Sequence, residues 1–201
     1  MSVDDESEPP PGGPVSVGTR SGPWFCHTRT PVYANPWIQL YHDTVTTPAG
    51  GDGIYGVVHF KCRAVGVVAI DAAQHIYLVK QHRYTLGDVT IEIPEGGCAE
   101  GEALLACAQR ELAEDAGLIA DNWQQIQLLH TSNSVTDESG AIFLATGLAT
   151  TEQALEETEA DLEVMRVPFS QAQAMVVRGE ITDAMSIIGI LRAAMVQAES
   201  R

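Results

Sequence analysis

Residues 96–118, GGCAEGEALLACAQRELAEDAGL, decide how this chain is interpreted. In a helix that includes Leu104, the residues seven and eleven positions further on, Glu111 and Asp115, lie on the same narrow stripe, because a helix turns by about 100° per residue. Glu114 lies beside that stripe. Burying an unpaired carboxylate is costly, so a stripe that begins with leucine and ends with two acids needs compensating positive charge.

The residues alone leave two explanations of this acidic stripe open. An acidic run on a helix is usually a solvated face. The alternative is a site for a divalent cation, because Arg110 neutralises one charge at most and Mg²⁺ prefers carboxylate oxygens and water as ligands. The spacing of the surrounding residues favours the cation site.

That spacing resembles the Nudix box, Gly-x5-Glu-x7-Arg-Glu-U-x-Glu-Glu-x-Gly-U, in which U is an aliphatic residue. Gly96, Glu102 and the run from Arg110 to Leu118 occupy its fixed positions. The single departure is Asp115, which stands where the motif has glutamate. On this motif the chain is identified as a member of the Nudix family.

The resemblance implies hydrolysis of a nucleoside diphosphate linked to another group, assisted by Mg²⁺ or Mn²⁺. It assigns Glu111 and Asp115 as the principal metal ligands and Glu114 as a further ligand. The backbone carbonyl of Glu95 stands where the family often supplies another. Arg110 is expected to orient a box carboxylate, and we count it with Glu111 among the catalytic residues.

Four further segments resemble the ADP-ribose pyrophosphatase and nucleoside diphosphate sugar hydrolase branch of the family. They are residues 33–37 (YANPW), 81–84 (QHRY), 91–97 (IEIPEGG) and 179–187 (GEITDAMSI). The resemblance implies a nucleoside diphosphate sugar as substrate. It also implies a homodimer, because in that branch the N-terminal strands cross to a second subunit. Ile91 departs from the tryptophan that is usual there.

The catalytic base is expected on a loop after the box, where the branch usually carries a glutamate. In this chain the acidic run 156–161 occupies that region. We select Glu159 first and Glu157 second. The alternative for most of this run is a solvated acidic loop.

Substrate binding is assigned to four residues, each on resemblance or side-chain chemistry. Arg83 is the best phosphate clamp, because a planar guanidinium suits bidentate contact, although it can also be a surface arginine ending a strand. Tyr84 and Glu92 belong to the segments shared with the branch. Glu138 can contact the substrate, or simply form part of a polar turn.

The expected fold class is α/β: a Nudix α/β/α sandwich with a mixed β-sheet, preceded by an N-terminal antiparallel β segment. Residues 1–22 read as a disordered tail, rich in Pro, Gly, Ser and acid. Residues 23–62 are the β segment, expected to dimerise, and 63–201 the Nudix hydrolase domain.

Several element boundaries can be predicted from the pattern. Residues 63–70 and 76–84 predict a buried hairpin. Glu102 is expected to open the box helix and Gly117 to end it. Two helices are expected at the end of the chain. The last one is expected to pack against the core through Ile187, Ile188, Leu191, Ala194 and Met195. In the N-terminal segment an exposed edge strand is expected to present Trp37, Ile38, Leu40 and Tyr41 for pairing with a second chain.

Charge and cysteine usage narrow the function classes. The chain has 27 acidic and 11 basic residues, a net charge of −16, which disfavours binding to nucleic acid or an anionic membrane. Its four cysteines show no metal-binding spacing and indicate thiols in a reducing cytoplasm. The chain has no apolar run of about 20 residues and no signal peptide, so we expect a cytoplasmic protein.

Two alternatives to a nucleoside diphosphate sugar hydrolase remain. One is hydrolysis of another nucleoside diphosphate derivative, such as a dinucleotide. The other is a non-hydrolytic sensor that binds a nucleotide sugar and regulates a partner. A DNA-binding regulator would need an added basic helix-turn-helix, which this sequence lacks.

Overall fold

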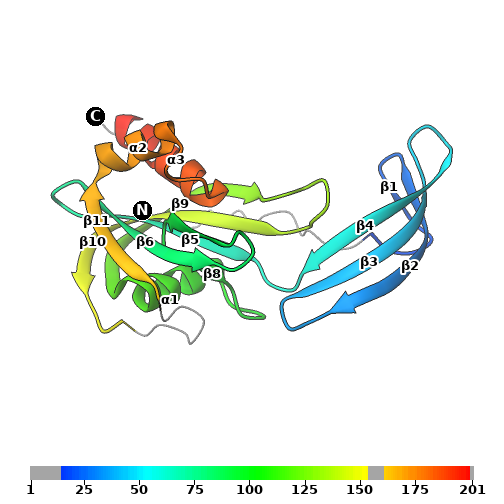
Figure 1. The fold of residues 1–201 in the computed structure, drawn as a ribbon, viewed down its shortest axis with the longest axis horizontal. Helices are drawn as coiled ribbons and strands as arrows, with labels where there is room; N and C mark the ends of the chain where they lie inside the picture. Colours follow the sequence, from blue (N-terminus) through cyan, green and yellow to red (C-terminus); the bar gives the residue numbers. More distant parts are fainter. Residues whose placement is uncertain (1–14, 154–160, 200–201) are drawn as a thin grey trace, which may run out of the picture. The chain divides into compact units, whose positions relative to one another are not determined.

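A computed structural model describes residues 15–153 and 161–199 of the 201-residue chain. The chain forms two compact units (Figure 1). The first comprises Met1–Arg63 with His130–Ser139, and the second comprises Ala64–Leu129 with Gly140–Arg201. Within the described residues, no helix is both long enough and apolar enough to cross a membrane.

The first unit is an antiparallel sheet whose strands follow one another in chain order. These strands are β1 (Arg20–Ser21), β2 (Trp24–Ala34), β3 (Ile38–Thr46) and β4 (Asp52–Phe60). Asn35 joins β2 to β3 as a side-chain turn, because its Oδ1 accepts the N–H groups of Trp37 and Ile38 at 2.9 and 2.8 Å. The antiparallel N-terminal segment expected from the sequence is confirmed.

Two details of this unit differ from expectation. Arg20 and Ser21 pair with Phe25 and Trp24, so the tail predicted to reach residue 22 does not include them. The strand with Leu40 is not an edge, because β3 pairs with β2 on one side and β4 on the other. Its residues Ile38, Leu40 and Tyr41 are therefore half-buried, while Trp37, which precedes the strand, is 65% exposed.

The second unit contains a seven-stranded mixed sheet. Its path runs β11-β6-β5-β10-β9, and β7 pairs with β6 while β8 pairs with β5. β5 lies parallel to β10 and antiparallel to β6. The bounds are β5 (Ala64–Ile70), β6 (His75–Arg83), β7 (Asp88–Glu92), β8 (Glu95–Gly97), β9 (Leu118–His130), β10 (Ser139–Thr150) and β11 (Glu163–Pro168).

Helices cover both faces of this sheet, which confirms the predicted α/β/α sandwich (Figure 1). β5 shows why, because its side chains alternate between the two faces. Val65, Val67 and Ala69 pack with α1 (Leu104–Ala116). Val68 and Ile70 pack in the opposite core with α2 (Phe169–Arg178) and α3 (Ala184–Glu199).

The face by which α3 packs was predicted only in part. Its buried residues are Met185, Ser186, Gly189, Ile190 and Ala193. Leu191 and Met195, which were expected in the core, are 44% and 52% exposed, whereas Ile187, Ile188 and Ala194 pack partly against it. The helix turns its small residues to the sheet: a Cβ on Gly189 would lie 2.9 Å from a Val68 methyl and 3.2 Å from an Ile142 methyl. Close approach thus decides the orientation.

Candidate active site

The box helix α1 ends where the sequence predicts but begins two residues later. Gly117 ends it in the left-handed conformation, with φ of 61° and its N–H bonded to the carbonyl of Ala113. The first helical residue is Leu104, so Glu102 does not open the helix. Instead, Glu102 closes the preceding turn, where its Oε2 accepts the N–H of Ala99 at 2.8 Å.

The apolar stripe of α1 is buried together with its acids. Leu104, Ala108 and Leu112 lie in the core between helix and sheet. Glu111 and Asp115 are on the same side and are only 6% and 1% exposed. The solvated-face explanation therefore fails for these two carboxylates, and their charge has to be compensated within the protein.

Arg110 supplies part of that compensation by contacting three carboxylates at once. Its Nη1 lies 2.8 Å from Glu111 and 2.7 Å from Glu114, and its Nε and Nη2 donate to Glu102 at 3.2 and 3.1 Å. Nη2 also donates to the carbonyl of Gly97 at 3.0 Å. Arg110 therefore connects the preceding turn, strand β8 and the helix.

Gly96 leaves the space that the Glu111 side chain occupies. A Cβ built on Gly96 would overlap the Glu111 carboxylate, closer than real atoms approach. Gly96 pairs with Val65 in the sheet, so its backbone cannot move aside freely. The glycine that begins the box is thus required by close packing against the box glutamate.

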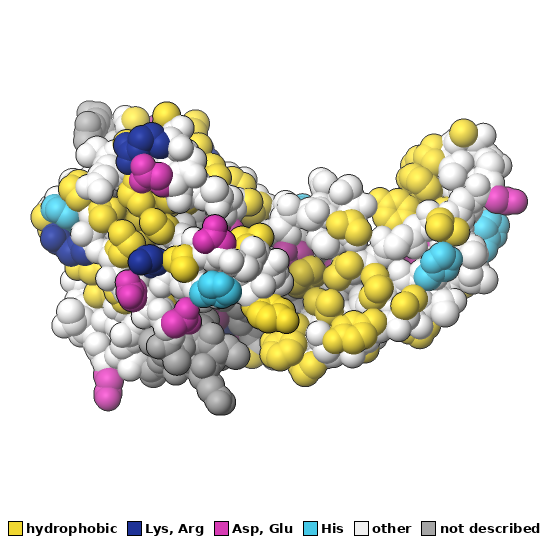
Figure 2. Space-filling model, viewed as in Figure 1, with side chains coloured by type: hydrophobic (Ala, Val, Ile, Leu, Met, Phe, Trp, Pro, Cys, Tyr) yellow, Lys and Arg dark blue, Asp and Glu magenta, His cyan; other side chains and the backbone are white. Residues whose placement is uncertain are grey.

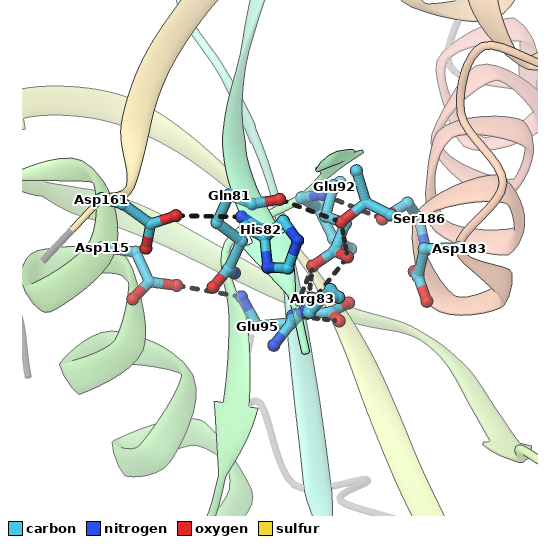
Figure 3. Close-up of polar contacts among 11 residues, drawn as sticks. Gln81, His82, Arg83, Glu92, Glu95, Asp115, Asp161, Asp183 and Ser186 are labelled. Carbon is cyan, nitrogen blue, oxygen red and sulfur yellow. Dashed lines mark hydrogen bonds and ion pairs between the residues drawn. The ribbon is translucent and has the colours of Figure 1, made fainter. Parts of the chain in front are cut away.

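Asp115 is held by the same short strand. Its Oδ2 accepts the backbone N–H of Glu95 at 3.1 Å (Figure 3). Glu95 is the first residue of β8 and pairs with Gly66 of β5. Strand β8 therefore contacts both buried acids of α1. Gly96 packs against the Glu111 carboxylate, and the Glu95 N–H donates to Asp115.

Arg83 forms a second ionic cluster at the end of β6. Its guanidinium donates to both oxygens of Glu92, which is 2% exposed, and its Nη2 lies 3.2 Å from Glu95 Oε1 (Figure 3). Thr90 donates a further hydrogen bond of 2.6 Å to Glu92. Arg83 is therefore not a solvated surface arginine. To bind a phosphate it would have to give up a contact with one of its carboxylate partners.

A cavity of about 290 Å³ opens beside this cluster, lined among others by Arg83, Glu92, Glu95 and Asp183. Burial raises the pKa of the Glu95 carboxyl well above its usual range, and the nearby charges of Asp183 and Glu92 raise it further. Among the described residues, Glu95 Oε2 is buried and accepts no hydrogen bond. This region carries more negative charge than one guanidinium compensates.

The remaining predicted residues are not all brought to this site. Tyr84 is 94% exposed, just after β6. Glu138 belongs to the first unit, where it accepts a hydrogen bond from the Thr131 hydroxyl. Glu157 and Glu159 lie outside the residues that the structure describes.

Sequence reasoning missed two residues next to the site, Asp183 and Ser186. Asp183 Oδ2 accepts the N–H of Ser186 at 2.6 Å, which makes it the N-cap of α3, and the Ser186 hydroxyl accepts the N–H of Ile93 at 2.9 Å. An acid three residues before Ser186 at the start of an apolar run is a recognisable N-cap signal. The contact with Ile93, 93 residues away, has no local signal.

Comparison with known families decides the assignment. The NUDIX domain model matches residues 61–184, well over half of the chain. The chain belongs to the Nudix family. A second model, the nucleoside diphosphate sugar hydrolase N-terminal domain, matches residues 23–58. This Nudix protein is therefore a pyrophosphohydrolase that acts on nucleoside diphosphate derivatives.

Individual relatives agree with this family. The chain is 38% identical over 155 residues to an ADP-ribose pyrophosphatase of Mycobacterium tuberculosis, which covers 76% of this chain and 74% of the relative. It is 27% identical over 161 residues to the methanol dehydrogenase activator of Bacillus methanolicus, covering 79% and 86%. A solved ADP compounds hydrolase shares the fold, with a TM-score of 0.80 at 16% identity over 90% of this chain and 98% of that one.

Nudix hydrolases generally use divalent metal ions. Among the described residues, no three His, Cys, Asp or Glu side chains converge as a complete protein cage. Mg²⁺ does not need such a cage, because it is usually bound through one or two carboxylates, water and substrate phosphates. Glu111 and Asp115, buried one turn apart, fit that mode of binding.

Proposed function

We propose that this protein hydrolyses the pyrophosphate bond of ADP-ribose or a related nucleoside diphosphate sugar, with Mg²⁺ or Mn²⁺, giving a nucleoside monophosphate and a sugar phosphate. The observation that carries the proposal is the 38% identity to an ADP-ribose pyrophosphatase over three quarters of the chain. The match of residues 23–58 to the N-terminal domain of nucleoside diphosphate sugar hydrolases supports the substrate class.

The metal site of this proposal consists of Glu111 and Asp115, with Glu114 and the backbone carbonyl of Glu95 as further ligands. A bound divalent cation would offset the negative charge of the pyrophosphate and of the leaving group. Such an offset is needed, because the protein carries a net charge of −16 and its substrate is an anion.

The protein's own residues have separable tasks in this reaction. Arg110 holds Glu111 and Glu114 in position through ion pairs of 2.8 and 2.7 Å. Arg83 lines the cavity beside β7 and would exchange its Glu95 contact for a phosphate oxygen. The proton of the attacking water goes to a base in the acidic run 156–161, for which Glu159 and then Glu157 are the candidates.

We also propose that the protein is a homodimer formed through its N-terminal sheet. Large apolar side chains are exposed on this unit, among them Val32, Tyr33, Trp37 and Ile54, and yellow side chains gather over the sheet in Figure 2. Light scattering at micromolar concentration should give the mass of two chains. The mass of a single chain would contradict the proposal. Deletion of residues 1–14 should leave the dimer intact.

The experiment that tests the function is a substrate panel with Mg²⁺ and with Mn²⁺, scored for phosphate monoester products. ADP-ribose and other nucleoside diphosphate sugars should be cleaved fastest, and chelation should abolish turnover. A dinucleotide cleaved fastest would favour the dinucleotide hydrolase. Tight binding of nucleotide sugars without any cleavage would favour the sensor and contradict the proposal.

A further inference from the structure

The amide of Ile93 is satisfied by a helix far along the chain. Ile93 lies between β7 and β8, is completely buried and donates its N–H to the hydroxyl of Ser186 at 2.9 Å. Ser186 is also completely buried, in the first turn of α3. A buried N–H without a partner costs free energy comparable to a lost hydrogen bond, so this contact fixes the backbone at Ile93.

The segment that Ser186 holds leads directly to the box acids. Pro94 follows Ile93, and its carbonyl accepts the N–H of Val67 at 2.8 Å. The next residue, Glu95, donates its N–H to Asp115, and after it Gly96 packs against the Glu111 carboxylate. Because proline restricts φ and the link from Ile93 to β8 is so short, a shift at Ile93 moves the Glu95 amide as well.

The helix that carries Ser186 is itself firmly placed. The Asp183 carboxylate accepts the Ser186 N–H at 2.6 Å, and the Asp183 backbone carbonyl accepts the Ile187 N–H at 3.0 Å. Its first turn packs closely on β5, since a Cβ on Gly66 would lie 2.7 Å from Met185 Sδ and 2.8 Å from Ile93 Cδ1. α3 therefore provides a rigid support for the link between β7 and β8.

We infer that Ser186 is a positioning residue for the reaction: it holds the link from Ile93 to Glu95 so that β8 sets the carboxylates of Asp115 and Glu111. This inference rests on the proposed function, because it concerns the same metal-binding acids. A hydroxyl that only stabilised the fold would affect the melting temperature but not the affinity for a divalent cation. Metal affinity therefore separates the two roles.

The test measures Mn²⁺ binding to the full-length protein without substrate, by electron paramagnetic resonance. Ser186→Ala should weaken Mn²⁺ binding by about tenfold, the effect typical of residues that orient metal ligands. It should also speed amide hydrogen exchange at Ile93 and Glu95. Ser186→Thr, which keeps the hydroxyl, should restore both towards wild-type values.

Ala193→Gly provides a matched control, because Ala193 is buried on the same face of α3, two turns further along. It should lower the melting temperature while leaving Mn²⁺ affinity and exchange at Ile93 unchanged. If Ser186→Ala does not fold, Ser186→Cys keeps nearly the same volume with a weaker acceptor and should show the same loss of affinity.

The outcomes distinguish this inference from the proposed function. Wild-type affinity for Mn²⁺ in Ser186→Ala, or in Ser186→Cys where only that variant folds, would overturn the inference and leave the function standing. An equal loss of affinity in Ala193→Gly would also overturn it, because the effect would then follow stability. Absence of Mn²⁺ binding by the wild-type protein without substrate would overturn the inference, whereas absence of cleavage in the substrate panel would overturn the proposed function.

Discussion

Two arginines of the Nudix domain each hold several carboxylates, but over different distances along the chain. The partners of Arg110 lie within eight residues of it, on one turn and one helix, whereas those of Arg83 are nine and twelve residues away, on β7 and β8. Arg110 contacts Glu102, Glu111 and Glu114. Arg83 contacts Glu92 and Glu95.

The two clusters also differ in how well their charges are compensated. A hydrogen bond from Arg110 holds the pKa of Glu102 below its usual range. In the other cluster, burial together with Asp183 and Glu92 raises the pKa of Glu95. Arg110 therefore stabilises the ionised form of Glu102, whereas Arg83 does not offset the burial of Glu95 beside the cavity. We connect the first with holding the box and the second with receiving ligands.

The largest effect is expected from filling the space beside Glu111. Gly96→Ala places a methyl group where the Glu111 carboxylate lies, so turnover should fall by about 100-fold or more while the fold is retained. Steady-state kinetics and circular dichroism measure the two quantities. Gly56→Ala, at a strand position of the first unit with open space around its Cα, controls for replacing a glycine. Full activity in Gly96→Ala would show that Glu111 need not occupy its present position.

The next effect concerns Asp115, whose carboxylate is one methylene shorter than that of the family's glutamate. Asp115→Asn should raise the Mg²⁺ concentration for half-maximal rate by about 10- to 100-fold, because it removes a coordinating charge. Asp115→Glu should lower that concentration or leave it unchanged. If Asp115 only accepts the Glu95 N–H, Asp115→Asn would change stability alone, and Asp115 would leave the metal site.

Exchanging each arginine for lysine tests the comparison directly. Lysine keeps one positive charge but cannot contact several carboxylates in the same geometry. Arg110→Lys should reduce kcat by about tenfold and raise the Mg²⁺ requirement. Arg83→Lys should instead raise KM for the nucleotide sugar and leave the Mg²⁺ requirement unchanged. Identical effects of the two substitutions would remove the distinction between scaffold and ligand-binding cluster.

Distance along the chain also explains what the sequence could predict. Glu111 and Asp115 are one helical turn apart, so their shared stripe follows from helical periodicity, and Arg110 reaches Glu114 at the same spacing of four residues. The buried hairpin of the mixed sheet follows from apolar runs, and the sandwich was implied by the resemblance of the element order to the Nudix family. The partners of Arg83 depend instead on the register of β6 with β7, which pairs Val79 with Glu92 and Arg83 with Asp88.

Close packing was the other feature that the sequence did not show. The orientation of α3 depends on Gly189 and Ser186 approaching β5 and Ile93, which overrides the larger apolar side chains Leu191 and Met195. The role of Gly96 beside Glu111 was likewise hidden, although the motif fixes both positions. A motif states which residues are required, and only the structure shows what each one touches.

The smallest effects concern stability and its dependence on pH in the metal-free protein. The lowered pKa of Glu102 means that its stabilising contribution is present above its unfolded pKa and is lost as pH falls through the folded value. Glu102→Gln should therefore lower the melting temperature at pH 7 by about 2–4 °C, since solvent screens the pair, and by less near pH 3.

Glu95 should respond with the opposite sign. Its raised pKa means that the folded state keeps a proton that the unfolded state has lost, so its contribution becomes unfavourable as pH rises above the unfolded value. Glu95→Gln should raise the melting temperature at pH 7, in contrast to Glu102→Gln. Calorimetry of both variants across pH measures these melting temperatures. If both substitutions shifted the melting temperature in the same direction at pH 7, the difference between the two clusters would be contradicted.

The central claim, a metal-dependent pyrophosphate hydrolase built on the buried acids of the box, is tested most directly at Glu111. Glu111→Gln keeps the size of the side chain and removes its charge. ADP-ribose turnover should be measured with saturating Mg²⁺ for the wild-type protein and this variant, with circular dichroism as the check on folding. We predict a loss of about 100-fold or more in a folded protein. Near-wild-type turnover in Glu111→Gln would contradict the account.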